Sequence, residues 1–215
     1  MSQSRGDQTS WGDFVGRLYA QSEFDIDFGL ESMHAALDSE GHPEQSHQHI
    51  LVGGTNGKGG TASFLASMLQ AHGLRVGLYT SPHLLDLRER FRLQGRLLTR
   101  EAVARTGRRL LDIYGDAEDA SPRLSFFELT TLMAVTLFDG ADVDVGVYEV
   151  GLGGRLDATN ALGPDLSVIT NVARDHQNYL GETLEEIASE KSGITRDTVP
   201  LVVGRQDEPT ALETI

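Results

Sequence analysis

Apolar residues along the chain fall into short continuous runs that alternate with longer stretches of helical spacing. The short runs cover residues 49–52, 75–79, 143–150, 166–172 and 199–203, and each predicts a buried strand. Helical spacing covers residues 28–37, 61–73, 99–110, 129–138 and 183–193, and in the second of these stretches one buried apolar face is expected from Phe64, Leu65, Met68 and Leu69. The alternation predicts an α/β fold, with a mostly parallel sheet and helices on both faces.

The ends of several helices carry local signals. Ser125 with Glu128, and Thr183 with Glu186, have capping-box spacing, and Thr99 is placed to cap a third helix. No such signal organises residues 1–10. We therefore expect residues 1–24 to form a flexible leader and a first helix, and residues 25–215 to form the folded domain.

Composition and charge narrow the class of protein. The chain has 215 residues, of which 39% are apolar and 23% charged, enough for one α/β domain or for one domain with an incomplete second. It has no apolar run of membrane length, no secretory signal and no cysteine, which fits a cytoplasmic protein. The net charge of −14 argues against a nucleic-acid partner. A solvated acidic surface explains this charge, and adaptation to high salt is one form of that explanation.

Polar or glycine-rich segments follow the predicted strands directly. They are the turn at residues 53–60, the segment 80–83, Glu149 with residues 151–154, and Asp175 with His176. Ligands of open α/β sheets bind beyond the carboxyl ends of the strands. We expect these segments to meet at one edge of the sheet.

The turn between the first strand and its helix has the character of a phosphate-binding loop. Backbone N–H groups and the helix N-terminus would surround phosphates, and Lys58 would reach the β and γ oxygens. The spacing departs from the strict Walker motif, with Val52 at its first glycine, so a glycine-rich turn beside a chance lysine is the alternative. The predicted nucleotide-binding residues are Gly54, Thr55, Asn56, Gly57, Lys58, Gly59, Gly60 and Thr61.

An ordered set of motifs resembles the Mur ligase superfamily, and the folylpolyglutamate/dihydrofolate synthases in particular. The resemblance extends over residues 25–215 and implies a P-loop domain similar to the central domain of Mur ligases. The stretches that carry it are Gly54-Thr-Asn-Gly-Lys-Gly59, Tyr79-Thr-Ser-Pro-His-Leu84, Phe127-Glu128, Glu149-Val-Gly-Leu-Gly-Gly-Arg-Leu-Asp-Ala-Thr-Asn160, Asp175-His-Gln177 and Glu190-Lys-Ser-Gly193.

A divalent metal is expected beside the phosphates. Glu149 ends an apolar strand, where an unpaired carboxylate would be costly, so a cation should accompany it. Mg²⁺ is the favoured cation, and an arginine or lysine is the alternative. The resemblance implies that Ser81, Glu149 and His176 are the metal ligands. The family usually has a hydroxyl residue where this chain has Gly60, so Thr61 or Ser81 must supply that oxygen.

Lys58 and Lys191 are the lysines of a chain whose other basic side chains are arginines. The resemblance implies that Lys191 is modified by CO₂ to a carbamate beside the metal, which requires an amine that can lose its proton. A cation near the end of a helix, favoured by the helix dipole, is the alternative.

The acceptor substrate is expected to bind at the same edge. Phe126 and Phe127 could stack on a pteridine and Asp157 could accept its N–H groups, although core packing is the alternative for both phenylalanines. For His42, His47 and His49, a polar loop entering a strand explains their proximity better than zinc. The predicted substrate-binding residues are Ser81, Pro82, His83, Phe126, Phe127, Arg155 and Asp157.

The resemblance implies a reaction in which ATP with Mg²⁺ phosphorylates the carboxylate of dihydropteroate or a folate, and L-glutamate then attacks the acyl phosphate. Lys58, Glu149, His176 and Lys191 would carry the chemistry. The expected partners are small molecules, and a monomer is expected. Family members are about twice as long, with a C-terminal glutamate-binding domain absent here, so we expect nucleotide binding but little ligase activity from this chain alone. Alternatives are a nucleotide- or folate-binding module, a cell-wall Mur-type ligase, and a simple GTPase or kinase, whose loop spacing fits less well.

Overall fold

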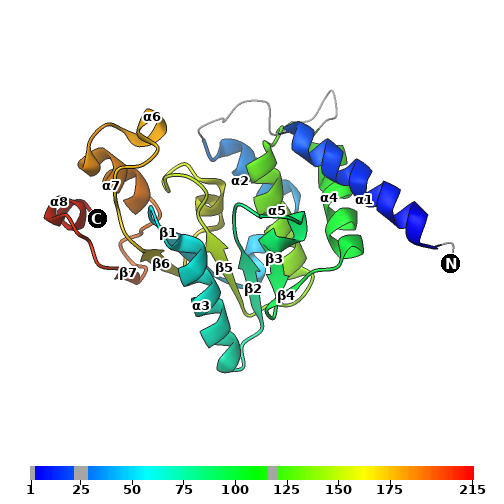
Figure 1. Ribbon diagram of the computed structural model, residues 1–215, viewed down its shortest axis with the longest axis horizontal. Coiled ribbons are helices and arrows are strands. Elements are labelled where there is room, and N and C mark those ends of the chain that lie inside the picture. The colour runs from blue at the N-terminus through cyan, green and yellow to red at the C-terminus, as the bar shows by residue number, and fades with distance from the viewer. Residues whose placement is uncertain (1–2, 22–28, 116–120) are drawn as a thin grey trace.

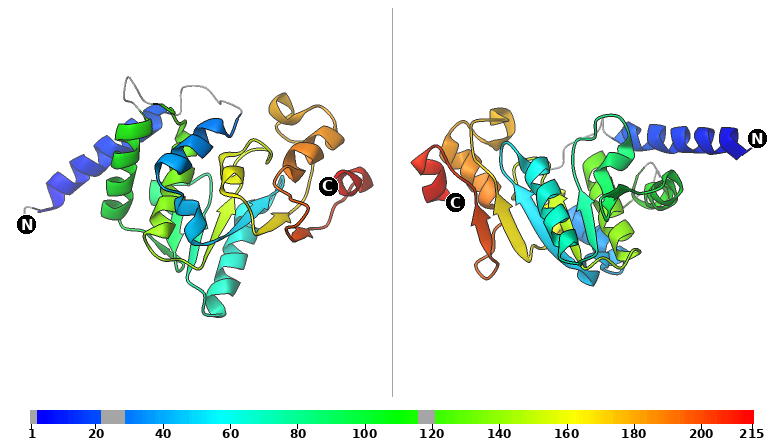
Figure 2. Two further views of the ribbon diagram at one scale, coloured as in Figure 1. Left: turned by 180° about the vertical axis from the view of Figure 1, so that it is seen from behind. Right: turned by 60° about the horizontal axis from the view of Figure 1, so that its bottom comes forward.

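The computed structural model describes residues 3–21, 29–115 and 121–215, and within these ranges the chain forms one twisted sheet with helices on both faces (Figures 1 and 2). Five neighbouring strands run parallel, and β3 and β4 form an antiparallel hairpin at one edge. In sheet order the strands are β4 (Arg96–Leu97), β3 (Phe91–Leu93), β2 (Val76–Tyr79), β5 (Val145–Glu149), β1 (Gln48–Gly53), β6 (Leu166–Ile169) and β7 (Leu201–Val203).

Side chains that alternate along the strands build two cores, one on each face of the sheet. In β1, Ile50 and Val52 face the smaller core beneath α3 (Lys58–Ala71), whereas Leu51 faces the larger one. The larger core is covered by the other long helices, of which α5 is central (Figure 2). These are α1 (Gln3–Ala20), α2 (Glu31–Ser39), α4 (Arg100–Tyr114), α5 (Phe126–Asp139) and α7 (Leu184–Ser192).

Shorter helices connect these elements. They are the 3-10 helices η2 (Pro43–Ser46), η3 (Leu87–Arg90) and η4 (Ala158–Leu162), and the short α-helices α6 (Gln177–Leu180) and α8 (Pro209–Thr214). In the described part of the chain, no helix is long and apolar enough to cross a membrane.

The predicted capping signals are confirmed. Thr99 accepts the N–H of Ala102 at 3.2 Å, and full capping boxes open α5 and α7. The five strands predicted from apolar runs are also present, with tighter bounds. These features were predictable because each depends on residues close together in sequence.

Other expectations were wrong. The β3–β4 hairpin was not predicted, and α3 begins at Lys58 rather than near residue 61. Phe64 and Met68 are 74% and 56% exposed, because α3 packs its small residues Ala62 and Ala66 against the branched side chains of the sheet. Helix α1 begins at Gln3, so most of the predicted leader is helical, whereas residues 22–28 lie outside the described ranges.

Candidate functional site

The glycine-rich loop joins the carboxyl end of β1 to the N-terminus of α3. Gly54 and Gly57 have φ angles of +130° and +79°, and a Cβ on Gly54 would lie 2.0 Å from Thr170 Oγ1, so glycine is required there. Lys58 is the first residue of α3, and its Nζ donates to the carbonyls of Gly54 and Thr55 at 3.2 and 3.3 Å. The lysine therefore folds back over the loop, and the N–H groups of the helix N-terminus lie beside it.

The segment after β6 holds this loop in place. The N–H of Thr55 donates to the Asn171 carbonyl at 2.7 Å, and the N–H of Asn56 donates to Asn171 Oδ1 at 2.9 Å. Thr170 Oγ1 donates to the carbonyl of Asn56 at 2.8 Å. Sequence reasoning missed Thr170 and Asn171, and the available signal was a polar pair directly after a buried strand on the same edge.

Glu149 lies at the end of β5, 6% exposed, with its carboxylate pointing toward the loop region. Burial raises its pKa, and this is partly offset by the N–H of Ser81, which donates to Oε2 at 2.9 Å, and by the Lys58 charge. A Cβ on Gly59 would lie only 3.0 Å from Oε2. Close approach to Glu149 thus explains the glycine that follows the lysine.

Lys191 lies in the last turn of α7 and is 3% exposed. Its Nζ donates to the carbonyl of Gly54 at 3.1 Å, the same oxygen that Lys58 contacts. Burial, followed by the nearby Lys58 charge, lowers the pKa of Lys191 to about 8. Both lysines therefore converge on one carbonyl, and Lys191 has the character of an amine that can lose its proton near neutral pH.

His176 follows β6 on the same edge, at the start of α6. Its ring is 55% exposed, and Nε2 lies 3.6 Å from Asp175 Oδ2. Among the described residues, no three His, Asp or Glu side chains are grouped to hold a metal. The structure thus joins Ser81 to Glu149, and a metal-binding role for His176 stays a prediction.

Asp157 and Phe127 both lie close to Gly151, where a Cβ would be 2.6 Å from the Phe127 ring and 3.1 Å from Asp157 Oδ2. Asp157 is buried, which raises its pKa, and its carboxylate accepts the N–H groups of Gly151, Leu152 and Thr159 and the Thr159 hydroxyl. This carboxylate therefore organises its own loop. Its contact with a pteridine stays a prediction.

Arg155 ties the glycine-rich segment after β5 to α7. Its guanidinium pairs with Glu190 at 2.7 Å, and its N–H donates to the Glu190 carbonyl at 2.9 Å. A Cβ on Gly154 would lie 2.7 Å from the Lys191 carbonyl, so the backbones pack closely. In this structure Arg155 positions the turn that contains Lys191.

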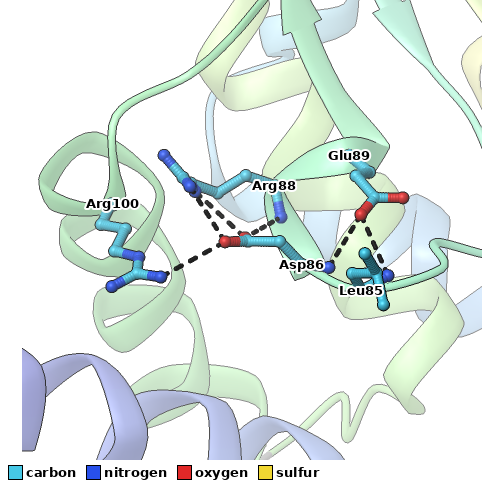
Figure 3. A network of polar contacts seen from close by, with 5 residues as sticks. All are labelled: Leu85, Asp86, Arg88, Glu89 and Arg100. Carbon is cyan, nitrogen blue, oxygen red and sulfur yellow. Dashed lines mark hydrogen bonds and ion pairs between the residues drawn. The ribbon is translucent and has the colours of Figure 1, made fainter.

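The segment after β2 brings its polar residues to the same edge. His83 Nδ1 accepts from Arg90 Nε at 2.9 Å, and Pro82 is exposed. Beyond them, Glu89 accepts the N–H groups of Leu85 and Asp86, while Asp86 binds Arg88 and Arg100 (Figure 3). These polar contacts fix the conformation of the loop next to Ser81 and His83.

Three of the histidines lie toward the other end of the sheet. His47 Nε2 is 2.7 Å from the hydroxyl of Tyr148, and His49 Nδ1 is 3.1 Å from the Gly163 carbonyl. His42 pairs with Glu44. The interpretation of these residues as a polar loop entering a strand is consistent with this arrangement.

The Mur ligase middle domain family model matches residues 52–213. The dihydrofolate synthase/folylpolyglutamate synthase of Haemophilus influenzae is 43% identical over 187 residues, which cover 87% of this chain and 41% of that protein. The folylpolyglutamate synthase of Thermotoga maritima has a TM-score of 0.86 and 38% identity, over 96% of this chain and 47% of that one.

A second solved relative is a bifunctional folylpolyglutamate synthase/dihydrofolate synthase with Mn, AMPPNP and L-glutamate bound. It has a TM-score of 0.82 and 37% identity, over 94% of this chain and 48% of that one. The chain spans between about a quarter and a half of the length of the curated relatives it matches, and about half of these solved structures.

Proposed function

Because this chain belongs to the Mur ligase middle-domain family, we propose that it binds ATP and Mg²⁺ for a ligase that joins L-glutamate to a pteroate or folate carboxylate through an acyl phosphate. The convergence of Lys58 and Lys191 on Gly54, near the buried carboxylate of Glu149, carries this proposal. The names of the relatives support the substrate class.

Phosphate binding would use the loop and the start of α3. Lys58 donates to two neutral carbonyls, which it can exchange for the β and γ oxygens of the nucleotide. The N–H groups at the helix N-terminus add partial positive charge at the same place. A phosphoryl group in transfer needs such positioning and charge neutralisation more than covalent help.

The oxygen atoms at the end of β5 fit a hard divalent cation. Glu149 is buried and its pKa is raised by that burial, so an adjacent cation would stabilise its charged form. The Ser81 N–H donates to the Glu149 carboxylate, and the hydroxyl of Ser81 or Thr61 is the proposed further oxygen ligand. His176 is the proposed further ligand. The cation would neutralise charge on the transferred phosphoryl group.

Lys191 would take up CO₂ to form a carbamate. The unprotonated amine attacks the carbon of CO₂ and releases a proton, so the reaction requires the neutral amine. With a pKa of about 8, roughly one Lys191 side chain in four is unprotonated at pH 7.5, against about one in a thousand for an ordinary lysine. The carbamate would replace the positive charge of Lys191 by a negative charge beside Lys58. Attraction to Lys58 would therefore favour the carbamate.

The acceptor would bind near Phe127 and Asp157, at the loop after β5. Dihydropteroate and folate polyglutamates share the pteridine and benzoyl rings, so both fit this proposal.

We also propose that the partners are small molecules and that the protein is a cytoplasmic monomer.

Calorimetry with Mg²⁺ and AMPPNP tests the nucleotide part. Lys58→Ala should weaken binding at least tenfold, because it removes the charged contact to the phosphates. Arg205→Ala, which removes an exposed cation elsewhere, should leave binding unchanged. Equal affinity of the parent and the Lys58 variant would contradict the proposal.

Two alternatives are separated by activity. ADP release, even slow, that requires both pteroate and L-glutamate supports the ligase, whereas binding of nucleotide and pteroate with no ADP release at any enzyme concentration favours a nucleotide- or folate-binding module. Turnover with a cell-wall precursor instead of pteroate would favour another Mur-type ligase. The family match alone leaves that second alternative open.

A further inference from the structure

Helix α1 places Tyr19 at the candidate substrate site. This helix precedes residue 25, where the resemblance to the synthases begins. The hydroxyl of Tyr19 is 2.5 Å from His83 Nε2, and its ring stacks on Phe126 with centroids 5.5 Å apart and planes 11° apart. Both contacted residues were predicted to bind substrate. Tyr19 is 40% exposed, so the stack is accessible on its Tyr19 side.

The hydrogen bonds around His83 have a fixed direction. Arg90 Nε can only donate, so His83 Nδ1 at 2.9 Å must be an unprotonated acceptor. The ring proton is therefore on Nε2, which donates to the Tyr19 hydroxyl oxygen. The two hydrogen bonds that link Arg90, His83 and Tyr19 thus select one tautomer of His83 and orient the Tyr19 side chain.

Arg90 itself is 6% exposed, and its guanidinium carbon lies 5.0 Å from the centroid of the Phe126 ring. Among the described residues, its Nη1 is buried without a hydrogen-bond partner. A buried donor left unpaired costs stability, and functional sites are where such a cost is tolerated. Ordinary core packing would have placed an apolar side chain beneath Phe126.

We infer that Tyr19, stacked on Phe126, is the platform that receives the aromatic ring of the acceptor acid, and that Arg90 positions this platform through Phe126 and His83. Stacked aromatic side chains offer a π surface to a planar ring at little conformational cost. The buried guanidinium adds positive charge beneath it, which favours a ligand that bears a carboxylate. This inference rests on the proposed function and adds α1 to the acceptor site.

The test uses pteroate, p-aminobenzoate and pterin as probes, with AMPPNP and Mg²⁺ as the reference ligand. Tyr19→Ala should weaken pteroate binding about tenfold by removing both the stack and the hydrogen bond, and Tyr19→Phe about threefold by removing the hydrogen bond alone. AMPPNP affinity should stay within about twofold of the parent. Ile113→Ala is the matched control, because Ile113 on the neighbouring helix α4 is 43% exposed.

The three probes identify which part of the ligand the platform contacts. Loss of p-aminobenzoate affinity with pterin affinity retained supports contact with the benzoyl ring and its carboxylate, as the charge of Arg90 predicts. The opposite pattern would overturn the role given to Arg90. ¹⁵N spectra of labelled histidine, assigned with His83→Asn, should show the Nε2-protonated tautomer and a change in its signal on pteroate binding. A purely structural tyrosine would not produce that change.

The outcomes separate this inference from the proposed function. Unchanged pteroate affinity in a folded Tyr19→Ala protein overturns the inference and leaves the proposed function intact. Failure of the parent to bind pteroate while it binds AMPPNP also overturns the inference. Failure to bind AMPPNP at all contradicts the proposed function itself.

Discussion

Acid should destabilise the fold through His47, and replacing this residue should remove that sensitivity. Burial, assisted by the neighbouring His49, lowers the pKa of His47 from 6.5 to about 4. Its ring lies 2.7 Å from the Tyr148 hydroxyl and stacks near it, in an environment that disfavours charge. The unfolded chain therefore binds a proton at His47 more readily than the folded one.

The sign and the pH window follow from this difference. The destabilisation begins as the pH falls below 6.5 and is complete below about 4. Linkage between these two pKa values gives a loss of about 2 kcal/mol at pH 5, and partial solvent exposure of the ring reduces this to about 1–2 kcal/mol. His49, whose pKa is also lowered by burial, acts in the same direction. Nearby Asp165 opposes both shifts.

Other groups titrate in or near this window, so the measurement needs a difference between two proteins. Burial raises the pKa values of Glu149 and Asp157, and these groups favour the folded state as the pH falls. Hydrogen bonds from Arg88 lower the pKa of Asp86 to about 2, so its stabilising effect is lost only below about pH 4. These contributions are the same in the parent and in a variant of His47.

The assay is urea denaturation of the parent and of His47→Gln at pH 7.5 and pH 5. Glutamine keeps a polar group near Tyr148 but cannot be protonated. The parent should lose about 1–2 kcal/mol more than the variant between the two pH values. Equal losses in the two proteins would refute the reasoning, whatever their absolute stabilities.

Two further predictions concern the loop and Lys191. Gly59→Ser should weaken Mg²⁺–AMPPNP binding at least tenfold, as measured by calorimetry, because its Cβ would lie 3.0 Å from Glu149 Oε2. At the next position a Cβ meets nothing within 4 Å, so Gly60→Ser should raise the stability of the helix by about 0.5 kcal/mol, as measured by thermal denaturation. Native mass spectrometry in bicarbonate should show a 44 Da adduct that Lys191→Arg abolishes, and an adduct that persists in this variant would place the carbamate elsewhere.

Much of the architecture could be predicted because it is encoded locally. The capping boxes at Ser125 and Thr183 and the apolar run before Gly53 each depend on neighbours in sequence. The helical face of α3 was misassigned because Phe64 and Met68 have helical spacing, yet only packing against the sheet decides which stripe is buried. The short β3–β4 hairpin lacks an apolar run long enough to predict a strand.

The candidate site was predictable in part. The order of strands and motifs placed Lys58 and Glu149 on one edge, and the resemblance implied that Lys191 is near them; the structure brings the three side chains together. Tyr19 and Arg90 could not be predicted, because the contact of Tyr19 with His83 joins residues 64 positions apart and has no motif. Asp157 has the residue type expected for ligand binding, but its hydrogen bonds are with its own loop.

The carbonyl oxygen of Gly54 that both lysines share has a consequence for ligand selection. Two ammonium groups held side by side repel each other, so an arriving anion relieves an existing electrostatic tension. Elsewhere the molecule, with its net charge of −14, repels anions at long range. The proposed nucleotide ligand carries less negative charge in complex with a divalent cation than in its free form, so this outer field repels the metal complex less.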